Sequence, residues 1–295
     1  SSKAPESSSG TSTYAPVNEL NQYQTRSIPR RVDVIGTANP TATITVNGQA
    51  ASFTGDYFLK TFDYSSEPNP YDARLDIYAV EGTLTGGGDG GADAIATDEG
   101  EIFLPANPEA FTYDDDGNLL TDGQWSYSWN GENRLIEVET LAVAYNAGVD
   151  RLKLEFAYDS QGRRFSKKVY GWNPVSGVWD LQSESFFIYD GWNLIWERTT
   201  QGGETTEKTF VWGLDLSGTQ HQQGAGGIAG LLWVREKSGI QITRSFVPAY
   251  DGNGNVIALF DQAGALTESY EYGPFGEPIE FRDEETLNPF RFSTK

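Results

Sequence analysis

Apolar and polar side chains alternate with a period of two in the first third of the chain, which is typical of half-buried β-strands. The segment 41–46 alternates strictly and is followed by Asn47-Gly48, a dipeptide that favours a type I′ hairpin turn. Further strand candidates, all short runs of apolar and β-branched residues, lie at 53, 57–59, 75–80 and 102–104. Polar loops rich in Gly and Pro separate these runs, so we expect an antiparallel β-sandwich of immunoglobulin-like shape over residues 32–108.

From about residue 109 the chain repeats one short unit, in which an aromatic residue is followed by Asp, a turn with Gly and an apolar residue. Complete units occupy 113–119, 158–164 and 250–256, and a contracted unit occupies 189–194. A variant with Trp in the place of Tyr occupies 129–135, and a turn at 261–266 lacks the aromatic residue. The residues expected to build these turns are Tyr113, Asp114, Gly117, Tyr158, Asp159, Gly162, Tyr189, Asp190, Gly191, Tyr250, Asp251 and Gly254.

Each residue type in this unit has a physical reason for its position. The Asp carboxylate accepts backbone N–H groups two residues further on, and Gly adopts the positive φ that the turn requires. The aromatic ring packs on the sheet, and we expect its polar tip to reach solvent. Hairpins of this kind bury a face only by stacking on their neighbours, so residues 109–295 are expected to form one long antiparallel β-sheet that winds as a spiral.

The fold class predicted for the whole chain is all-β. No amphipathic segment of helical length follows residue 110, and only a short turn is expected at 227–233. Residues 1–31 are expected to be a flexible Ser-rich leader and connection, because so polar a stretch cannot bury apolar area. Within it, NELNQY at 18–23 resembles half of a repeat. The expected domains are therefore 1–31, 32–108 and 109–295.

Composition excludes several classes of function. The 295 residues include 42 acidic and 21 basic side chains, a net charge of −21, which argues against nucleic acid or anionic membrane as a partner because phosphate contacts need clustered Lys and Arg. No apolar run is long enough for membrane insertion. The absence of Cys excludes thiol catalysis, zinc–thiolate sites and iron–sulfur clusters, and we expect no cofactor. The lack of Cys and Met, together with the acidity, favours an extracellular or cell-surface location, and the opening Ser1 indicates a processed product or a fragment.

The candidate chemical sites have simpler structural explanations. The Asp-rich turns at 114–116 and 251–255 offer oxygen ligands to calcium, as does the Gly-rich segment 86–93, but none of these segments matches a calcium-binding motif. Turn chemistry accounts for these Asp residues, so no metal site is assigned and calcium is left as an alternative. His221 lies near Asp215 without a nucleophile-elbow motif, which favours a loop histidine over a Ser–His–Asp site. No catalytic residue is assigned.

A row of aromatic residues accompanies the repeats and has two interpretations, a platform that stacks sugars or packing between strands. Packing is favoured because these residues follow the repeat instead of clustering in one segment. They are Trp125, Tyr127, Trp129, Trp172, Trp179, Trp192 and Trp196.

The repeats, together with the segments 212–218, 223–227 and 272–276, resemble the RHS (YD-repeat) family, and 288–293 resembles the start of its core region. The resemblance covers about 111–295. This family includes bacterial secreted and surface proteins, insecticidal toxin components and the animal teneurins. The resemblance implies a β-sheet that spirals into a shell, closed around a toxic C-terminal domain in some members and used for adhesion in others. The chain has fewer repeats than a closed shell needs and shows neither the tyrosine-rich segment nor the self-cleavage site, so encapsulation and autoproteolysis are assigned to none of its residues.

The sequence therefore predicts a non-enzymatic, extracellular structural or adhesive protein. Unpaired strand edges would join it by strand addition to other copies of itself, or of a longer parent chain, in a surface fibre. The Ser-rich leader and the aromatic tail Asn288, Pro289, Phe290 and Phe292 are the candidate assembly segments. Two alternatives are left open: a shell segment of a secreted RHS-type polymorphic toxin, which serves encapsulation and delivery, and a carbohydrate-binding module that contacts surface glycans.

Overall fold

The structure is a computed structural model that describes residues 6–9, 11–81, 94–219, 224–273, 276, 278–281 and 288–292. Its elements are β-strands apart from one four-residue helix, α1 (Ala142–Tyr145), so the predicted all-β fold is confirmed. The chain divides into two compact units, Ser1–Arg151 and Leu152–Lys295. The three domains expected from the sequence stay a prediction. No helix in the described part of the chain is long and apolar enough to cross a membrane.

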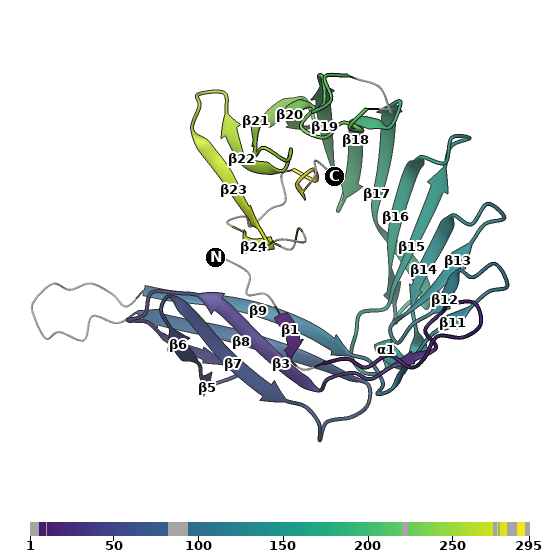
Figure 1. The fold of residues 1–295 in the computed structure, drawn as a ribbon, viewed down its shortest axis with the longest axis vertical. Helices are drawn as coiled ribbons and strands as arrows, with labels where there is room; N and C mark the ends of the chain where they lie inside the picture. The colour runs from purple at the N-terminus through teal and green to yellow at the C-terminus, as the bar shows by residue number, and fades with distance from the viewer. Residues whose placement is uncertain are drawn as a thin grey trace, which may run out of the picture. The chain divides into compact units, whose positions relative to one another are not determined.

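The first unit contains a sandwich of two four-stranded antiparallel sheets (Figure 1). One sheet has the order β1 (Glu6–Ser9), β3 (Arg31–Thr37), β7 (Tyr57–Asp63) and β6 (Ser52–Thr54). The other has the order β5 (Gln49–Ala50), β4 (Thr43–Val46), β8 (Tyr71–Glu81) and β9 (Ala94–Leu104). Strands of both sheets contribute to one apolar core, in which Val32, Val34, Val46 and Leu75 are fully buried. Asn47 and Gly48 have φ angles of 49° and 71°, which confirms the predicted type I′ turn between β4 and β5.

The remainder of the first unit begins the repeat region. β2 (Thr25–Arg26) pairs with β10 (Glu109–Ala110), and Arg26 forms an ion pair with the buried carboxylate of Glu109. A meander follows in chain order: β11 (Thr112–Tyr113), β12 (Leu119–Thr121), β13 (Trp125–Trp129) and β14 (Leu135–Thr140).

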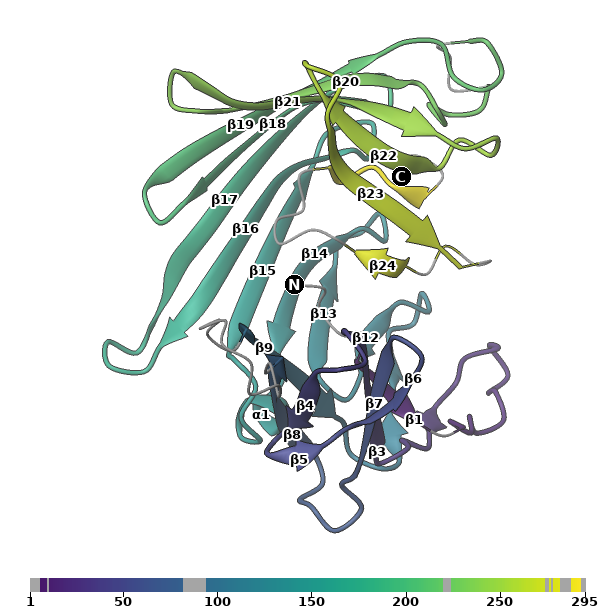
Figure 2. The same cartoon turned by 90° about the vertical axis from the view of Figure 1, so that its left-hand side faces the viewer.

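The second unit is a meander of strands in chain order, visible in Figures 1 and 2. Its strands are β15 (Leu152–Tyr158), β16 (Arg164–Asn173), β17 (Val178–Asp190), β18 (Asn193–Gln201), β19 (Glu204–Trp212), β20 (Leu231–Ser238), β21 (Gln241–Tyr250), β22 (Val256–Asp261), β23 (Leu266–Tyr272) and β24 (Pro278–Phe281). One face of β18 to β23 buries a second apolar core that includes Phe210, Leu231, Val234 and Leu259. The long meander expected for the repeat region is thus present within this unit.

Asp72, on β8, lies against acidic neighbours in the first unit. Burial, the largest cause, raises the pKa of Asp72 to about 6. Repulsion from Glu101 and a hydrogen bond shared with it raise this pKa further, as does Asp150, whereas Arg74 lowers it. The pKa of this carboxyl in the folded chain therefore lies above its ordinary value of 3.8. Protonated Asp72 favours folding, so its contribution is present below about pH 4 and is lost as the pH rises through about 6.

We expect Asp72→Asn to increase the free energy of unfolding at pH 7.5 by about 1 kcal/mol, a value discounted for the partial exposure of this carboxyl to solvent. At pH 3.5 the variant should match the wild type, because Asp72 is then uncharged. Urea unfolding at the two pH values checks this. An equal gain at both would show that the effect comes from packing and not from charge.

Candidate functional site

The repeat turns share one hydrogen-bond pattern over five residues, seen clearly at Asp251. The carboxylate Oδ1 of Asp251 accepts the backbone N–H groups of Asn253 and Asn255, both at 2.9 Å. The Asp251 N–H donates to the Asn255 carbonyl at 3.0 Å, and the Gly254 N–H donates to the Asp251 carbonyl at 3.1 Å. Gly254 has a φ of 82°, a conformation that L-residues with a side chain rarely adopt. An acidic residue, two free positions and a glycine thus suffice to define the turn.

The same five-residue pattern of backbone hydrogen bonds recurs along both units. Its first residues are Asn18, Asp114, Asn130, Asp159, Asp215, Asp251 and Asp261. Asn18 belongs to the half-repeat expected at 18–23, and Asn21 takes the position of the glycine with a φ of 61°. Asp190 and Gly191 instead form the short hairpin expected for a contracted unit, in which Asp190 pairs with Asn193. The sequence reasoning missed the Asp215 turn, although its signal, Asp with Gly three residues later, is present at 215–218.

The turn hydrogen bonds stabilise the ionised form of the aspartates. The Ser217 hydroxyl donates to Asp215 Oδ1 at 2.6 Å, and this bond, with backbone N–H groups of Thr219 and Gly227, lowers the pKa of Asp215 to about 2. The pKa values of Asp114 and Asp159 are also lowered, by the side-chain hydrogen bond of Asn118 and by the backbone N–H of Arg163 respectively. Asp215 is thus committed to its turn. His221, which was considered as a catalytic partner of Asp215, lies outside the described residues. The Gly-rich segment 86–93, which was considered for calcium, also lies outside them.

The aromatic residue before each turn anchors one hairpin to the hairpin before it. The Tyr189 hydroxyl donates to the Arg164 carbonyl at 3.0 Å, and the Tyr272 hydroxyl donates to the Val256 carbonyl at 2.7 Å. Trp212 Nε1 donates to the Leu194 carbonyl at 2.7 Å. The same bond joins Tyr113 to the carbonyl of Tyr23, Trp129 to Leu119, and Tyr250 to Leu231. The accepting carbonyl lies just after the preceding turn at the same end of the strands. The bonds of Tyr113 and Tyr189 lie at exposed positions, whereas those of Trp129, Trp212, Tyr250 and Tyr272 are partly buried, so the expectation that the polar tips reach solvent stays a prediction.

A register shift accompanies every one of these aromatic residues. The strand pairing slips by one residue immediately before Tyr113, Trp129, Tyr158, Tyr189, Trp212, Tyr250 and Tyr272. A β-bulge at this place bends the strand and re-aims the side chain that follows it. The structural unit is therefore a bulge, an aromatic anchor and an Asp turn. The turn that follows Tyr272 has a glycine in the same position: Gly276 has a φ of 85°, and its N–H donates to the carbonyl of Gly273 at 3.0 Å.

Removing a single anchoring hydroxyl tests this description. We expect Tyr272→Phe to lower the free energy of unfolding by about 1 kcal/mol, because the Val256 carbonyl loses its donor. Burial raises the pKa of Tyr272 to about 12, above its ordinary value of 10, so the contribution of this tyrosine is retained up to about pH 10 and is lost as the pH rises through about 12. Between pH 10 and pH 12, the free energy of unfolding of Tyr272→Phe should therefore fall less steeply than that of the wild type. Urea unfolding from pH 8 to pH 12 measures both effects; the exposed Tyr57→Phe is the control and should change neither.

The C-terminal segment with the candidate assembly residues packs within the second unit. Asn288 is fully buried and forms two hydrogen bonds with Phe290. Its Nδ2 donates to the Phe290 carbonyl at 2.5 Å, and its Oδ1 accepts the Phe290 N–H at 3.2 Å. The Phe290 ring meets the rings of Phe210 and Trp212 edge-on, with centroids 5.2 and 5.0 Å away. Phe292 likewise contacts Tyr272, and the Arg291 carbonyl accepts the N–H of Val256. Pro289 is exposed. An assembly role for this segment stays a prediction.

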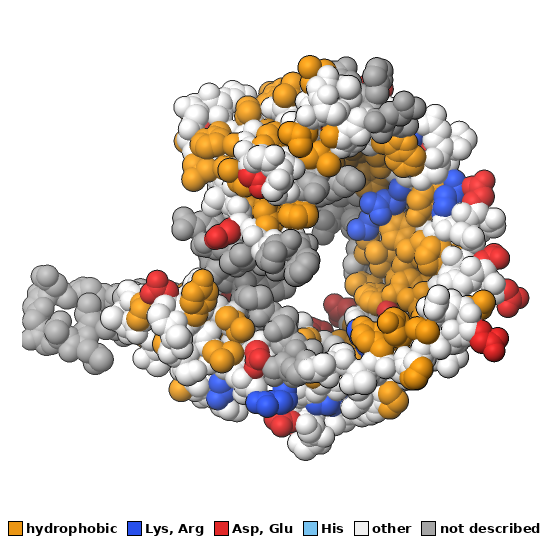
Figure 3. All heavy atoms as spheres, viewed as in Figure 1, with side chains coloured by type: hydrophobic (Ala, Val, Ile, Leu, Met, Phe, Trp, Pro, Cys, Tyr) orange, Lys and Arg blue, Asp and Glu red, His pale blue; other side chains and the backbone are white. Residues whose placement is uncertain are grey.

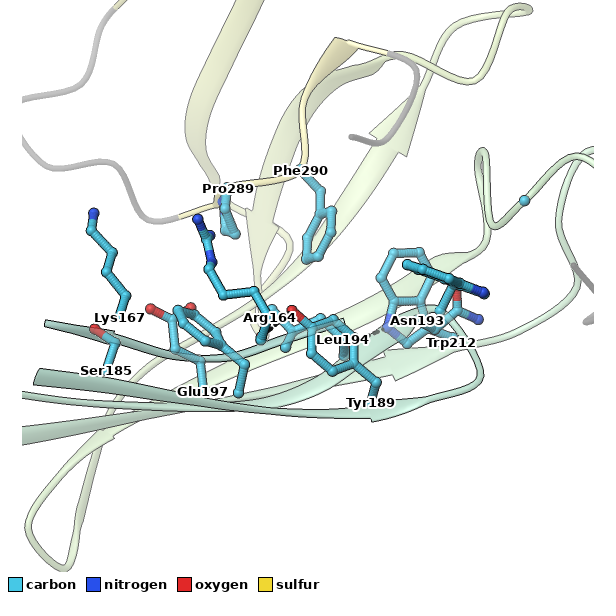
Figure 4. Close-up of a pocket in the computed structure, with 13 residues that line it drawn as sticks. Arg164, Lys167, Ser185, Tyr189, Asn193, Leu194, Glu197, Trp212, Pro289 and Phe290 are labelled. Atoms are coloured by element: carbon cyan, nitrogen blue, oxygen red, sulfur yellow. Dashed lines mark hydrogen bonds between the residues drawn. The ribbon is translucent and has the colours of Figure 1, made fainter. Parts of the chain in front are cut away.

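A cavity of about 840 Å³ lies between this segment and the sheet (Figure 4). Pro289 and Phe290 form one side, and the rings of Tyr189 and Trp212 lie across from them in Figure 4. Phe187 also lines the cavity. Figure 3 shows apolar side chains gathered on the sheet around β15 to β17, with Lys and Arg side chains beside them. In the part of the chain that the structure describes, no group of three or more His, Asp or Glu side chains is arranged to hold a metal ion.

Known proteins similar to this chain were found among sequences and among solved structures, although no family model matches it. The tRNA3(Ser)-specific nuclease WapA of Bacillus spizizenii is 26% identical over 191 residues, and the tRNA nuclease WapA of Bacillus subtilis strain 168 is 25% identical over 189 residues. Each match covers 63% of this chain and 7% of the relative, so the chain spans a small part of their length.

Two solved structures align with 96% of this chain and 13% of theirs. A TcdB2–TccC3 structure is 14% identical with a TM-score of 0.42, and the Tc holotoxin pore of Photorhabdus luminescens is 15% identical with a TM-score of 0.45.

These sequence relatives correct two expectations. The expectation of a non-enzymatic protein is contradicted, because the relatives are named as tRNA nucleases. They also favour the alternative, a toxin segment, over the expected surface-fibre subunit. Local motifs did not indicate this, whereas the similarity to the nucleases extends over 191 residues. The exclusion of nucleic acid as a partner stays a prediction. The chain is an all-β protein similar, over 63% of its length, to a small part of the WapA nucleases.

Proposed function

We propose that the chain is a wall segment of an RHS-type toxin shell, located outside the producing cell, whose task is to contain and deliver a toxic domain. The observation that carries this proposal is the bond from each anchor aromatic to the carbonyl that follows the preceding turn. Such a sheet grows by adding hairpins in chain order, each locked to the one before by the same contact. An extended wall needs this kind of growth.

Two further observations support a wall. The hairpins of the second unit bury aromatic and aliphatic side chains on one face, including Phe210, Trp212 and Leu259, so the sheet has a distinct apolar side. The WapA relatives support containment in particular, because a nuclease that acts on tRNA is harmful to the cell that makes it unless it is held apart. The high negative charge of the chain keeps the outer surface soluble and mutually repulsive.

Electron microscopy of the native polypeptide that carries these residues tests the proposal. The polypeptide should be purified without a denaturing step, imaged in negative stain, and digested with a protease before and after the particles are opened with mild denaturant. We expect hollow particles and an interior polypeptide that is digested only after opening. Regular fibres would instead establish the surface-fibre function. Solid monomers with no protected interior would contradict a wall and would favour a binding module.

A second candidate function is nuclease activity, and the names of the WapA relatives are the observation that favours it. Incubation of the purified chain with total tRNA, with and without Mg²⁺, followed by a denaturing gel, tests it. Cleavage that disappears when the chain is heat-denatured would assign the activity to these residues. Intact tRNA under both conditions would leave the wall as the function of this chain.

A further inference from the structure

The cavity on β16 to β19 has the lining of a ligand site, which a wall alone does not require. Phe187, Tyr189 and Trp212 on the sheet line this cavity with aromatic rings. Figure 4 shows Phe290 pointing toward Tyr189 and Trp212 from the C-terminal segment. Trp192 lines the cavity although this residue is 57% exposed, which is unusual for so large an apolar group. The volume, about 840 Å³, falls within the range of roughly 300–1,000 Å³ that is typical of small-molecule sites.

Two cations face the same cavity. The Cζ of Arg164 lies 5.3 Å from the ring centroid of Phe187 and 5.5 Å from that of Phe156, so the rings hold this guanidinium in place. Figure 4 shows Arg164 and Lys167 rising from the sheet on the side where Pro289 lies. Within the described residues, neither cation forms an ion pair, whereas Lys168, which neighbours Lys167 in sequence, is paired with Glu184 at 3.3 Å.

The charge of these two residues contrasts with that of the chain, which carries a net −21. Glu197 is the one carboxylate among the described lining residues, and it accepts the hydroxyl of Thr199 at 3.3 Å. Two cations without carboxylate partners beside a set of aromatic rings attract an anion that also has an apolar, planar part. A neutral sugar would use the rings but not the cations.

From this geometry we infer that the cavity binds an aromatic carboxylate, with the carboxylate at Arg164 and Lys167 and the ring among Tyr189, Trp212 and Phe290. Both a free aromatic acid and a peptide with neighbouring acidic and aromatic side chains have this chemistry. The inference does not rest on the wall proposal, since it concerns binding to the isolated chain.

Calorimetric titration of the full chain with phenylacetate, and with uncharged phenylacetamide as the matched ligand, tests the inference. We expect phenylacetate to bind at least fivefold more tightly than phenylacetamide, because about 1 kcal/mol of partly exposed ion pairing corresponds to roughly that factor. Added salt should weaken the binding of phenylacetate but not that of phenylacetamide, because salt screens ion pairs. Lys167→Gln should weaken phenylacetate binding about fivefold. Lys168→Gln removes the same charge from the neighbouring position and should leave the affinity unchanged. Trp192→Ala should weaken both ligands, because its ring lines the cavity.

Three outcomes would overturn the inference: no binding of phenylacetate at tens of millimolar, equal affinity for the acid and the amide, or equal losses from Lys167→Gln and Lys168→Gln. Circular dichroism of each variant establishes that the fold is kept. Titration with N-acetyl-Glu-Phe-amide, against N-acetyl-Gln-Phe-amide, then identifies the source of the ligand. Tighter binding of the Glu dipeptide than of phenylacetate would support a peptide, and the reverse order would support a free acid. Failure of the cavity to bind these probes would leave the wall proposal untouched, because the anchored hairpins do not depend on it.

Discussion

Replacing Gly254 with alanine is expected to lower the free energy of unfolding by about 3 kcal/mol. Two costs add at this position. Gly254 has a φ of 82°, a left-handed conformation that costs a residue with a Cβ about 1–2 kcal/mol. A Cβ there would also overlap Ile228 Cγ2 and lie 3.3 Å from both the Cβ and the backbone N of Ala229, so the loop around 228 would have to move.

Gly264 provides a matched control for this substitution. It occupies the same position of the same five-residue turn with a φ of 81°, but a Cβ at Gly264 would meet no atom within 4 Å. Gly264→Ala should therefore show the conformational cost alone, about 1 kcal/mol. Urea unfolding followed by tryptophan fluorescence measures both variants. Equal losses would mean that the Gly254 turn does not pack on the 228 loop in solution.

Replacing Phe290 with alanine is expected to lower the free energy of unfolding by about 2–3 kcal/mol. The ring makes edge-to-face contacts with Phe210 and Trp212, and it belongs to the apolar core that Leu231 and Val234 also build. Its loss should release the C-terminal segment from the sheet. Limited proteolysis with trypsin, which cleaves after Arg291, should then remove the last residues faster than in the wild type.

Phe292→Ala is the control for Phe290→Ala. Phe292 is 36% exposed and, among the residues that the structure describes, makes one ring contact, with Tyr272, so its loss should cost about 1 kcal/mol or less. Size-exclusion chromatography of both variants also tests the predicted assembly role of this segment. A segment that donates itself to a neighbouring copy should cause the Phe290→Ala chain, with its segment released, to self-associate. Release of the segment in a chain that stays monomeric would contradict that role.

The local features of the fold were predictable because short stretches of sequence determine them. Strict alternation over 41–46 and the dipeptide Asn47-Gly48 indicated β4, β5 and the turn between them. The Asp turns were equally readable, since the carboxylate of Asp251 bonds N–H groups only two and four residues away. The half-repeat at 18–23 contains the same turn with Asn18 and Asn21 in the key positions.

The anchors were not predictable, because each one joins residues that are distant in sequence. Tyr189 reaches the carbonyl of Arg164, and Tyr113 reaches that of Tyr23, 90 residues away. The β-bulge before each aromatic has no residue type of its own, so the sequence carries no signal for it. Asp215 was considered beside His221 because both are chemically versatile, whereas its hydrogen bonds to Ser217 and Thr219 place it in a turn.

The sequence by itself determined an all-β chain of alternating strands and Asp-Gly turns, since these depend on the period of the side chains and on backbone conformations set within five residues. Only the tertiary structure decided how the hairpins lock together, where the tail lies and which residues share a cavity. Arg164, Trp212 and Phe290 line one site although they are far apart along the chain. That convergence depends on strand register and on packing, which act across the sheet and leave no local pattern.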